Sequence, residues 1–103
     1  MMNYDGTDFY VDLSSVKSGW TTSSYMLLEN YLTGYSAGQS SIHLIQVKCK
    51  SLKHKMVEAT YYSGLFGRGS FTDKLHEDWV QPVRGSVADA LDRAVCGYIK
   101  SKK

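Results

Sequence analysis

Alternating apolar and polar residues run from Ser41 to Tyr62 and predict a β-hairpin. Side chains alternate along a strand, so one face of the first arm carries His43, Ile45, Val47 and Cys49. Pairing of Val47 with Ala59 and of Ile45 with Tyr61 would bring the apolar sets of the two arms together. This register also sets Lys48 opposite Glu58. Because no Asn-Gly or Asp-Gly pair is present, we expect a connection of more than two residues around 52–54.

Two segments show helical periodicity, and a third shows strand alternation. Tyr25, Leu28 and Leu32 recur at helical spacing, which predicts a helix over 23–33. A second helix is predicted after Ser86, where Asp89 three residues on completes an acidic variant of the capping box. Its apolar stripe is Ala88, Leu91, Val95, Tyr98 and Ile99. Alternation over 8–13 predicts a first strand, and a further short edge strand is expected near Trp79 to Val83.

These elements predict an α+β fold, namely a small antiparallel sheet of three to four strands with two helices packed on it. A length of 103 residues predicts one domain over 1–103. Apolar residues make up 43% and charged residues 21% of the chain, as in an ordinary globular protein. The N-terminal segment carries acids where a signal peptide would carry bases, and it has no apolar run, so we expect a cytoplasmic protein without a membrane partner. Cys49 and Cys96 are then expected to be thiols, although a bridge between them stays open.

Positive charge gathers at the expected hairpin tip, although the formal net charge is only +2. Between Glu29 and Glu58 there is no acidic residue, whereas the same stretch contains Lys48, Lys50, Lys53 and Lys55. Such a protrusion produces a local positive potential that suits a polyanion or an acidic protein surface. The alternative is a solubilising tip that protects the sheet edge. A glycine-rich loop follows at 63–69, and its contact candidates, with the end of the second arm, are Tyr61, Tyr62, Phe66 and Arg68.

The sequence contains no complete catalytic or metal-binding signature. His43 and Cys49 are six residues apart on one strand face, which is not a zinc-ligand spacing. Neither cysteine lies in an evident activating setting, and the acidic cluster 76–78 is more typical of an exposed loop than of a general base. We therefore expect a protein that is not an enzyme and that needs no cofactor and no metal.

The closing segment 84–100, RGSVADALDRAVCGYIK, together with the preceding helix and hairpin, resembles the small α-β-β-α sandwich proteins found in phage genomes. The same ending is similar to HicB-type antitoxin domains. The phage resemblance implies a small stand-alone protein without a catalytic centre, which occludes a host enzyme or defence complex or sequesters a ligand.

The combined expectation is a cytoplasmic, non-enzymatic binding protein, such as a phage-type inhibitor of the anti-CRISPR kind, acting in the host cytoplasm on a host protein or ribonucleoprotein complex. One alternative is direct RNA or DNA binding through the basic tip, with affinity that falls steeply with salt. Another is a small-ligand sponge or an oligomeric accessory protein, since self-association through a sheet edge stays open. The contact residues expected in the leading case are Lys48, Lys50, Lys53, Lys55 and Arg68, with Tyr61, Tyr62 and Phe66 as aromatic neighbours.

Overall fold

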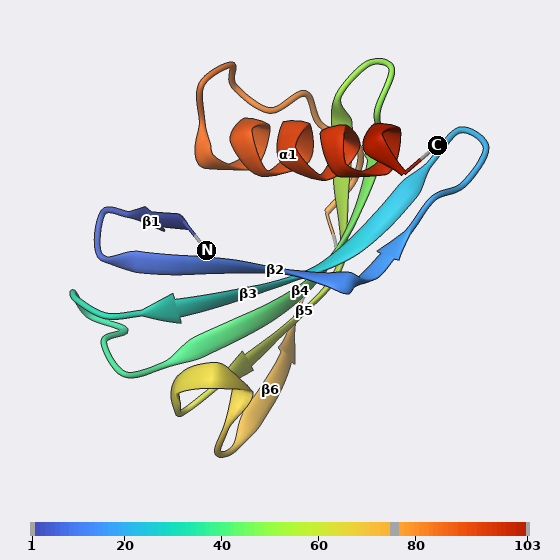
Figure 1. Cartoon of the computed structure of the whole chain (residues 1–103). Coiled ribbons are helices and arrows are strands. Elements are labelled where there is room, and N and C mark those ends of the chain that lie inside the picture. Colours follow the sequence, from blue (N-terminus) through green and yellow to red (C-terminus); the bar gives the residue numbers. More distant parts are fainter. Residues whose placement is uncertain (1, 75–76, 103) are drawn as a thin grey trace.

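In the part of the chain that the structure describes, the fold is one antiparallel sheet with a single long helix across one of its faces (Figure 1). The computed structural model describes residues 2–74 and 77–102. The strands follow the chain as an unbroken meander, β1-β2-β3-β4-β5-β6, and the helix comes last. The bounds are β1 Met2–Tyr4, β2 Thr7–Lys17, β3 Ser23–Tyr31, β4 Ser40–Lys48, β5 Lys53–Tyr62, the 3-10 turn η1 Leu65–Gly67, β6 Phe71–Lys74 and α1 Val87–Ser101.

The expected three- to four-stranded sheet with two helices is therefore wrong, and the main reason is the segment 23–33. This segment forms β3, paired with β2 on one side and β4 on the other. Tyr25 and Leu27 point to the helix side and are buried, whereas Met26 and Leu28 alternate with them and are half-buried on the opposite face. A central strand that is packed on both faces carries apolar residues on both, so its sequence lacks clear alternation. The apolar residues of such a strand can then also match helical spacing.

The hairpin is confirmed as β4 and β5, but its expected register is wrong. Val47 lies opposite His54, and Ile45 lies opposite Met56. The tip occupies only residues 49–52, where Leu52 adopts a positive φ of 60° and its N–H bonds to the Lys48 carbonyl at 2.7 Å. A β-bulge lies between the pairs Leu44–Glu58 and Ile45–Met56. The short tip and this bulge together shift the register of β5 against β4 from the expected one.

The C-terminal helix is confirmed together with its cap. Ser86 is the N-cap residue, and its hydroxyl accepts the Asp89 N–H at 3.2 Å. Arg93 lies one turn after Asp89 and donates to its carboxylate at 3.0 Å. The core lies between helix and sheet, where Leu91, Val95 and Ile99 pack against four strand residues: Tyr25, Leu27, Ile45 and Val47. The expected first strand over 8–13 lies within β2.

The other sheet face is partly covered by the loop after β5. Two buried polar side chains hold η1 there: Asn30 accepts the Phe66 N–H at 2.8 Å, and Ser40 accepts the Gly67 N–H at 2.9 Å. The Phe66 ring lies 5.7 Å from that of Tyr10, centroid to centroid. The strand expected near 79–83 reduces to one bridge between His54 and Val80, while β6 occupies 71–74.

Candidate functional site

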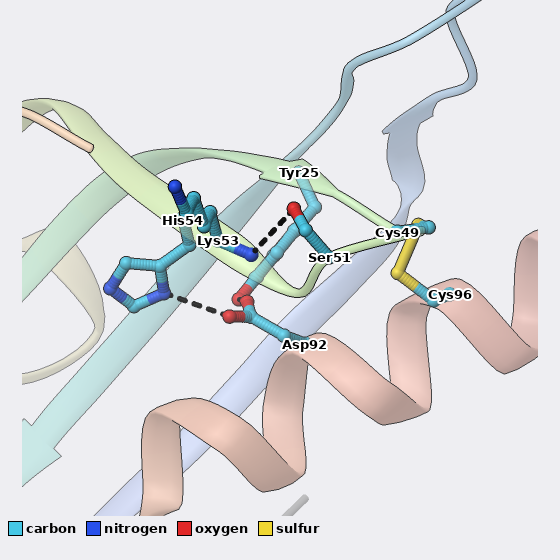
Figure 2. The surroundings of a disulfide bond; sticks show 7 residues. All are labelled: Tyr25, Cys49, Ser51, Lys53, His54, Asp92 and Cys96. Atoms are coloured by element: carbon cyan, nitrogen blue, oxygen red, sulfur yellow. Dashed lines mark hydrogen bonds and ion pairs between the residues drawn. A yellow bond between two sulfur atoms is a disulfide. The ribbon is translucent and has the colours of Figure 1, made fainter. Parts of the chain in front are cut away.

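A disulfide joins the tip of the β4–β5 hairpin to α1 (Figure 2). Cys49 begins the tip and Cys96 lies in the third turn of the helix, with Cα atoms 5.7 Å apart. The expectation of two reduced thiols is therefore wrong. Sequence alone could not show the pairing, because it depends on α1 lying over the same face to which β4 directs its odd-numbered residues.

The expected lysines gather around this cross-link, and Trp79 lies between two of them. The Lys48 ammonium is 4.4 Å from the centre of the Trp79 ring, and the Lys55 ammonium is 5.9 Å from it. Both distances are within the range of cation–π attraction. Lys50 and Lys53 are exposed at the tip. No ion pair involves any of these four lysines among the side chains that the structure describes. We call Lys48, Lys50, Lys53, Lys55 and Trp79 the basic end.

A groove that was not predicted from the sequence adjoins the basic end. It has a volume of about 770 Å³ and runs between the β2–β3 loop, the hairpin tip and the C-terminal half of α1. Its lining includes four cationic residues, Lys48, Lys50, Arg93 and Lys100, and no acidic residue. Trp20 also lines it and is wholly exposed. The helical signal was available, because Arg93, Cys96, Gly97 and Lys100 recur on one face of the predicted helix.

The remaining expected contact residues lie elsewhere. Tyr62, Phe66 and Arg68 belong to the end of β5 and the η1 loop, at the opposite end of the hairpin from its tip. Tyr61 lies on the helix-side face, where its ring is 6.1 Å from that of His43. The structure therefore does not bring the eight expected residues into one surface.

A second hollow, of about 700 Å³, lies under the N-terminal half of α1. Its apolar lining includes Phe9, Leu27 and Met56, and a polar chain of hydrogen bonds runs along one wall. In that chain Glu29 contacts the Nε2 atom of His43 at 3.1 Å, Ser41 contacts the same nitrogen at 2.7 Å, and Tyr31 contacts Ser41 at 2.6 Å.

Burial controls the protonation of this chain. Loss of solvent lowers the pKa of His43 and raises the pKa of Glu29. Both directions disfavour the charged forms, which is the opposite of what an ion pair between His43 and Glu29 would produce. Burial also raises the pKa of Tyr31 to about 12. The network therefore links side chains of neighbouring strands through hydrogen bonds.

A second buried network ties α1 to the sheet beside the disulfide (Figure 2). The Asp92 carboxylate accepts from the Tyr25 hydroxyl at 2.7 Å and from the His54 Nδ1 atom at 2.8 Å. The hydrogen bond to Asp92 raises the pKa of His54, while burial and the Asp92 charge raise that of Tyr25. Asp92 is fully buried, so its charge needs both partners.

The hydrogen bonds of Asp92 to Tyr25 and His54 stabilise the contact between α1 and the sheet. The adjacent cysteines offer no thiol nucleophile, because they form a disulfide. Within 2–74 and 77–102 no three His, Cys, Asp or Glu side chains are placed to hold a metal ion. His76, part of the acidic cluster 76–78, lies outside the described residues.

The sequence model of a family described as surface-adhesin protein E matches residues 1–97. Two crystal structures of Haemophilus influenzae protein E share the fold: one has a TM-score of 0.69 at 11% identity, covering 94% of this chain and 88% of the other. A second crystal form has a TM-score of 0.67 at 12% identity, covering 94% and 91%. No curated protein sequence matches.

These findings correct several expectations. The resemblance to phage α-β-β-α sandwich proteins and to HicB-type domains is wrong, and with it the phage inhibitor or anti-CRISPR function and the RNA- or DNA-binding alternative. A cytoplasmic location is also wrong, because the family consists of surface proteins. An adhesin family favours a non-enzymatic protein that binds host proteins or surface components, whereas ribonucleoprotein and nucleic-acid partners are unsupported.

Among the described residues, no helix is long and apolar enough to cross a bilayer. The family match spans nearly the whole sequence and agrees with the shared fold. This chain therefore belongs to the surface-adhesin protein E family.

Proposed function

We propose that this protein is a non-catalytic surface adhesin whose basic end contacts a component of the host surface. The observation that carries the proposal is the gathering of four lysines at one end of the molecule with no ion-paired carboxylate among the described side chains. Uncompensated charge at one site raises the rate at which an oppositely charged partner is captured.

The cross-link gives this end a second property of a contact surface, which is rigidity. Hairpin tips are ordinarily mobile, and ordering them on binding costs free energy. Here the Cys49–Cys96 bond fastens the tip to α1, and Trp79 packs against Lys48 and Lys55. A partner therefore meets lysines that are already held in position.

The loop residues Tyr62, Phe66 and Arg68 are left out of the proposed contact. They surround η1, whose backbone is already bonded to Asn30 and Ser40. The Phe66 ring, although partly exposed, already contacts the ring of Tyr10. Arg68 lies at this far end of the hairpin and therefore supplies a matched control.

The test measures binding of the purified protein to cultured epithelial cells. The variant K50E/K53E reverses two exposed charges at the tip, and R68E/R84E makes the same charge change elsewhere. We expect K50E/K53E to lose about tenfold in apparent affinity, which corresponds to roughly 1.4 kcal/mol, while R68E/R84E binds like the wild type. Equal behaviour of the two variants would show that the tip is not the contact surface.

A further inference from the structure

We infer that the groove beside the basic end is a binding site for a sulfated glycan chain. This inference rests on the proposed function and names the ligand class for it. The groove is lined by Lys48, Lys50, Arg93 and Lys100 and by no acidic residue, and of these four only Arg93 is paired with a carboxylate among the described side chains, through its Nε atom to Asp89. A concave site with one sign of charge concentrates counter-ions of the opposite sign, so the ligand is an anion.

The spacing of the cations indicates a polymer in place of a single small anion. Arg93 and Lys100 lie seven residues apart on the same face of α1, which at a rise of about 1.5 Å per residue separates their Cα atoms by about 10 Å along the helix. Lys50 approaches from the hairpin tip on the other side of the groove. A single phosphate or sulfate ion would have to draw these extended side chains together at one point, whereas a chain with repeated anionic groups can pair with each cation where it lies.

Trp20 indicates that the polymer is built of sugars. Its indole is wholly exposed on the β2–β3 loop at the wall of the groove, although an exposed tryptophan leaves a large apolar surface in water. The apolar faces of sugar rings stack on such a side chain, and the anionic groups of the same chain then reach the cations. On a surface protein the groove meets host cell surfaces, where sulfated glycans are the abundant polyanions.

The floor of the groove is open at Gly97. Apart from the chain neighbours and the backbone of α1 itself, a Cβ atom added there meets no atom within 4 Å, so a side chain at this position projects into free space. Gly97 lies between Arg93 and Lys100 on the helix face, and a glycine within a helix is intrinsically unfavourable. A residue larger than glycine can therefore be introduced into the groove without strain in the fold.

The test uses a size-defined heparin oligosaccharide as the probe and compares four variants of the full chain. Gly97→Glu puts an acid among the cations, Gly97→Ala fills the same position without charge, and Gln39→Glu makes the same charge change in the loop between β3 and β4. We expect heparin affinity to fall about tenfold for Gly97→Glu and to stay within about twofold for the two controls. We also expect Trp20→Ser to weaken binding and affinity to fall as salt rises.

Three outcomes would overturn the inference: unchanged affinity in Gly97→Glu, equal losses in Gly97→Glu and Gln39→Glu, or equally tight binding of polyglutamate or anionic lipid vesicles. The cell assay separates this failure from failure of the proposed function. If K50E/K53E loses cell binding while Gly97→Glu keeps its heparin affinity, the adhesin proposal stands and the glycan assignment falls. If the wild type binds no cells, the proposed function itself falls.

Discussion

Cys49 and Cys96 join the tip of a β-hairpin to the third turn of the only helix of eight or more residues that the structure describes, across 47 positions of sequence (Figure 2). The bond lies at the edge of the sheet–helix core and beside the lysines of the basic end. It therefore connects stability to the shape of the proposed contact surface, and a disulfide is typical of proteins outside the reducing cytoplasm.

Removal of this bond should destabilise the protein substantially. The double variant Cys49→Ser/Cys96→Ser releases a closed loop of nearly fifty residues, and the chain-entropy estimate for such a loop is about 4 kcal/mol. Urea unfolding followed by circular dichroism measures the change. The wild type in reducing agent should unfold at the same urea concentration as the double variant. A shift below about 1 kcal/mol would contradict the role assigned to the bond.

The Tyr25–Asp92 hydrogen bond should be worth more than a typical tyrosine contact. Tyr25→Phe removes the donor from one oxygen of a fully buried carboxylate, so we expect a loss of about 1–3 kcal/mol in the free energy of unfolding. Tyr62→Phe is the control, because Tyr62 is half-buried on the opposite face, and its cost should stay below about 0.5 kcal/mol. Equal costs for the two variants would mean that Asp92 finds another donor.

Buried His43 and half-buried His54 should produce stability changes of opposite sign with pH. The pKa of His54 is raised, so its contribution is complete below the ordinary histidine pKa of 6.5 and disappears as pH rises through the raised value. The pKa of His43 is lowered, so its contribution is complete above 6.5 and disappears as pH falls through the lowered value.

Unfolding of the wild type, His54→Asn and His43→Gln between pH 5 and 9 measures both effects. Asn keeps a donor near the Nδ1 position and Gln keeps one near Nε2, but neither takes up a proton. The advantage of the wild type over His54→Asn should shrink as pH rises, and its advantage over His43→Gln should shrink as pH falls. Parallel pH profiles for all three proteins would contradict the assigned protonation states.

Local signals in the sequence predicted the elements that depend on near neighbours. The Ser86–Asp89 cap and the apolar stripe after it define α1, and alternation defines β4 and β5. The same kind of signal misled at 23–33, where Tyr25, Leu28 and Leu32 match a helix although β2 and β4 hold the segment as a strand. Tertiary pairing overrides local preference in a strand covered on both faces.

The β1–β2 turn carried a signal that the sequence analysis overlooked. Asp5 and Gly6 form a two-residue connection with positive φ at both positions, 50° and 79°, as a type I′ hairpin requires. By contrast, the short edge strand β6 has no comparable signature.

Of the candidate site, the lysine run could be predicted from the sequence and the groove could not. The lysine run stands out along the chain, but the groove needs three segments that sequence does not place together: the loop at Trp20, the tip at Lys50 and the helix face at Arg93 and Lys100. The distribution of charge along the chain suggested a binding end. The acidic N-terminal segment suggested the wrong compartment, and the phage resemblance suggested the wrong partner.

The most direct test of the account is hydrogen–deuterium exchange of the full chain, with its disulfide intact, in the presence and absence of an epithelial cell-surface extract. The account predicts that bound protein gains protection at the tip, over 49–53, and that the η1 loop over 64–69 exchanges as in the free protein. Protection of the η1 loop with an unprotected tip would contradict it.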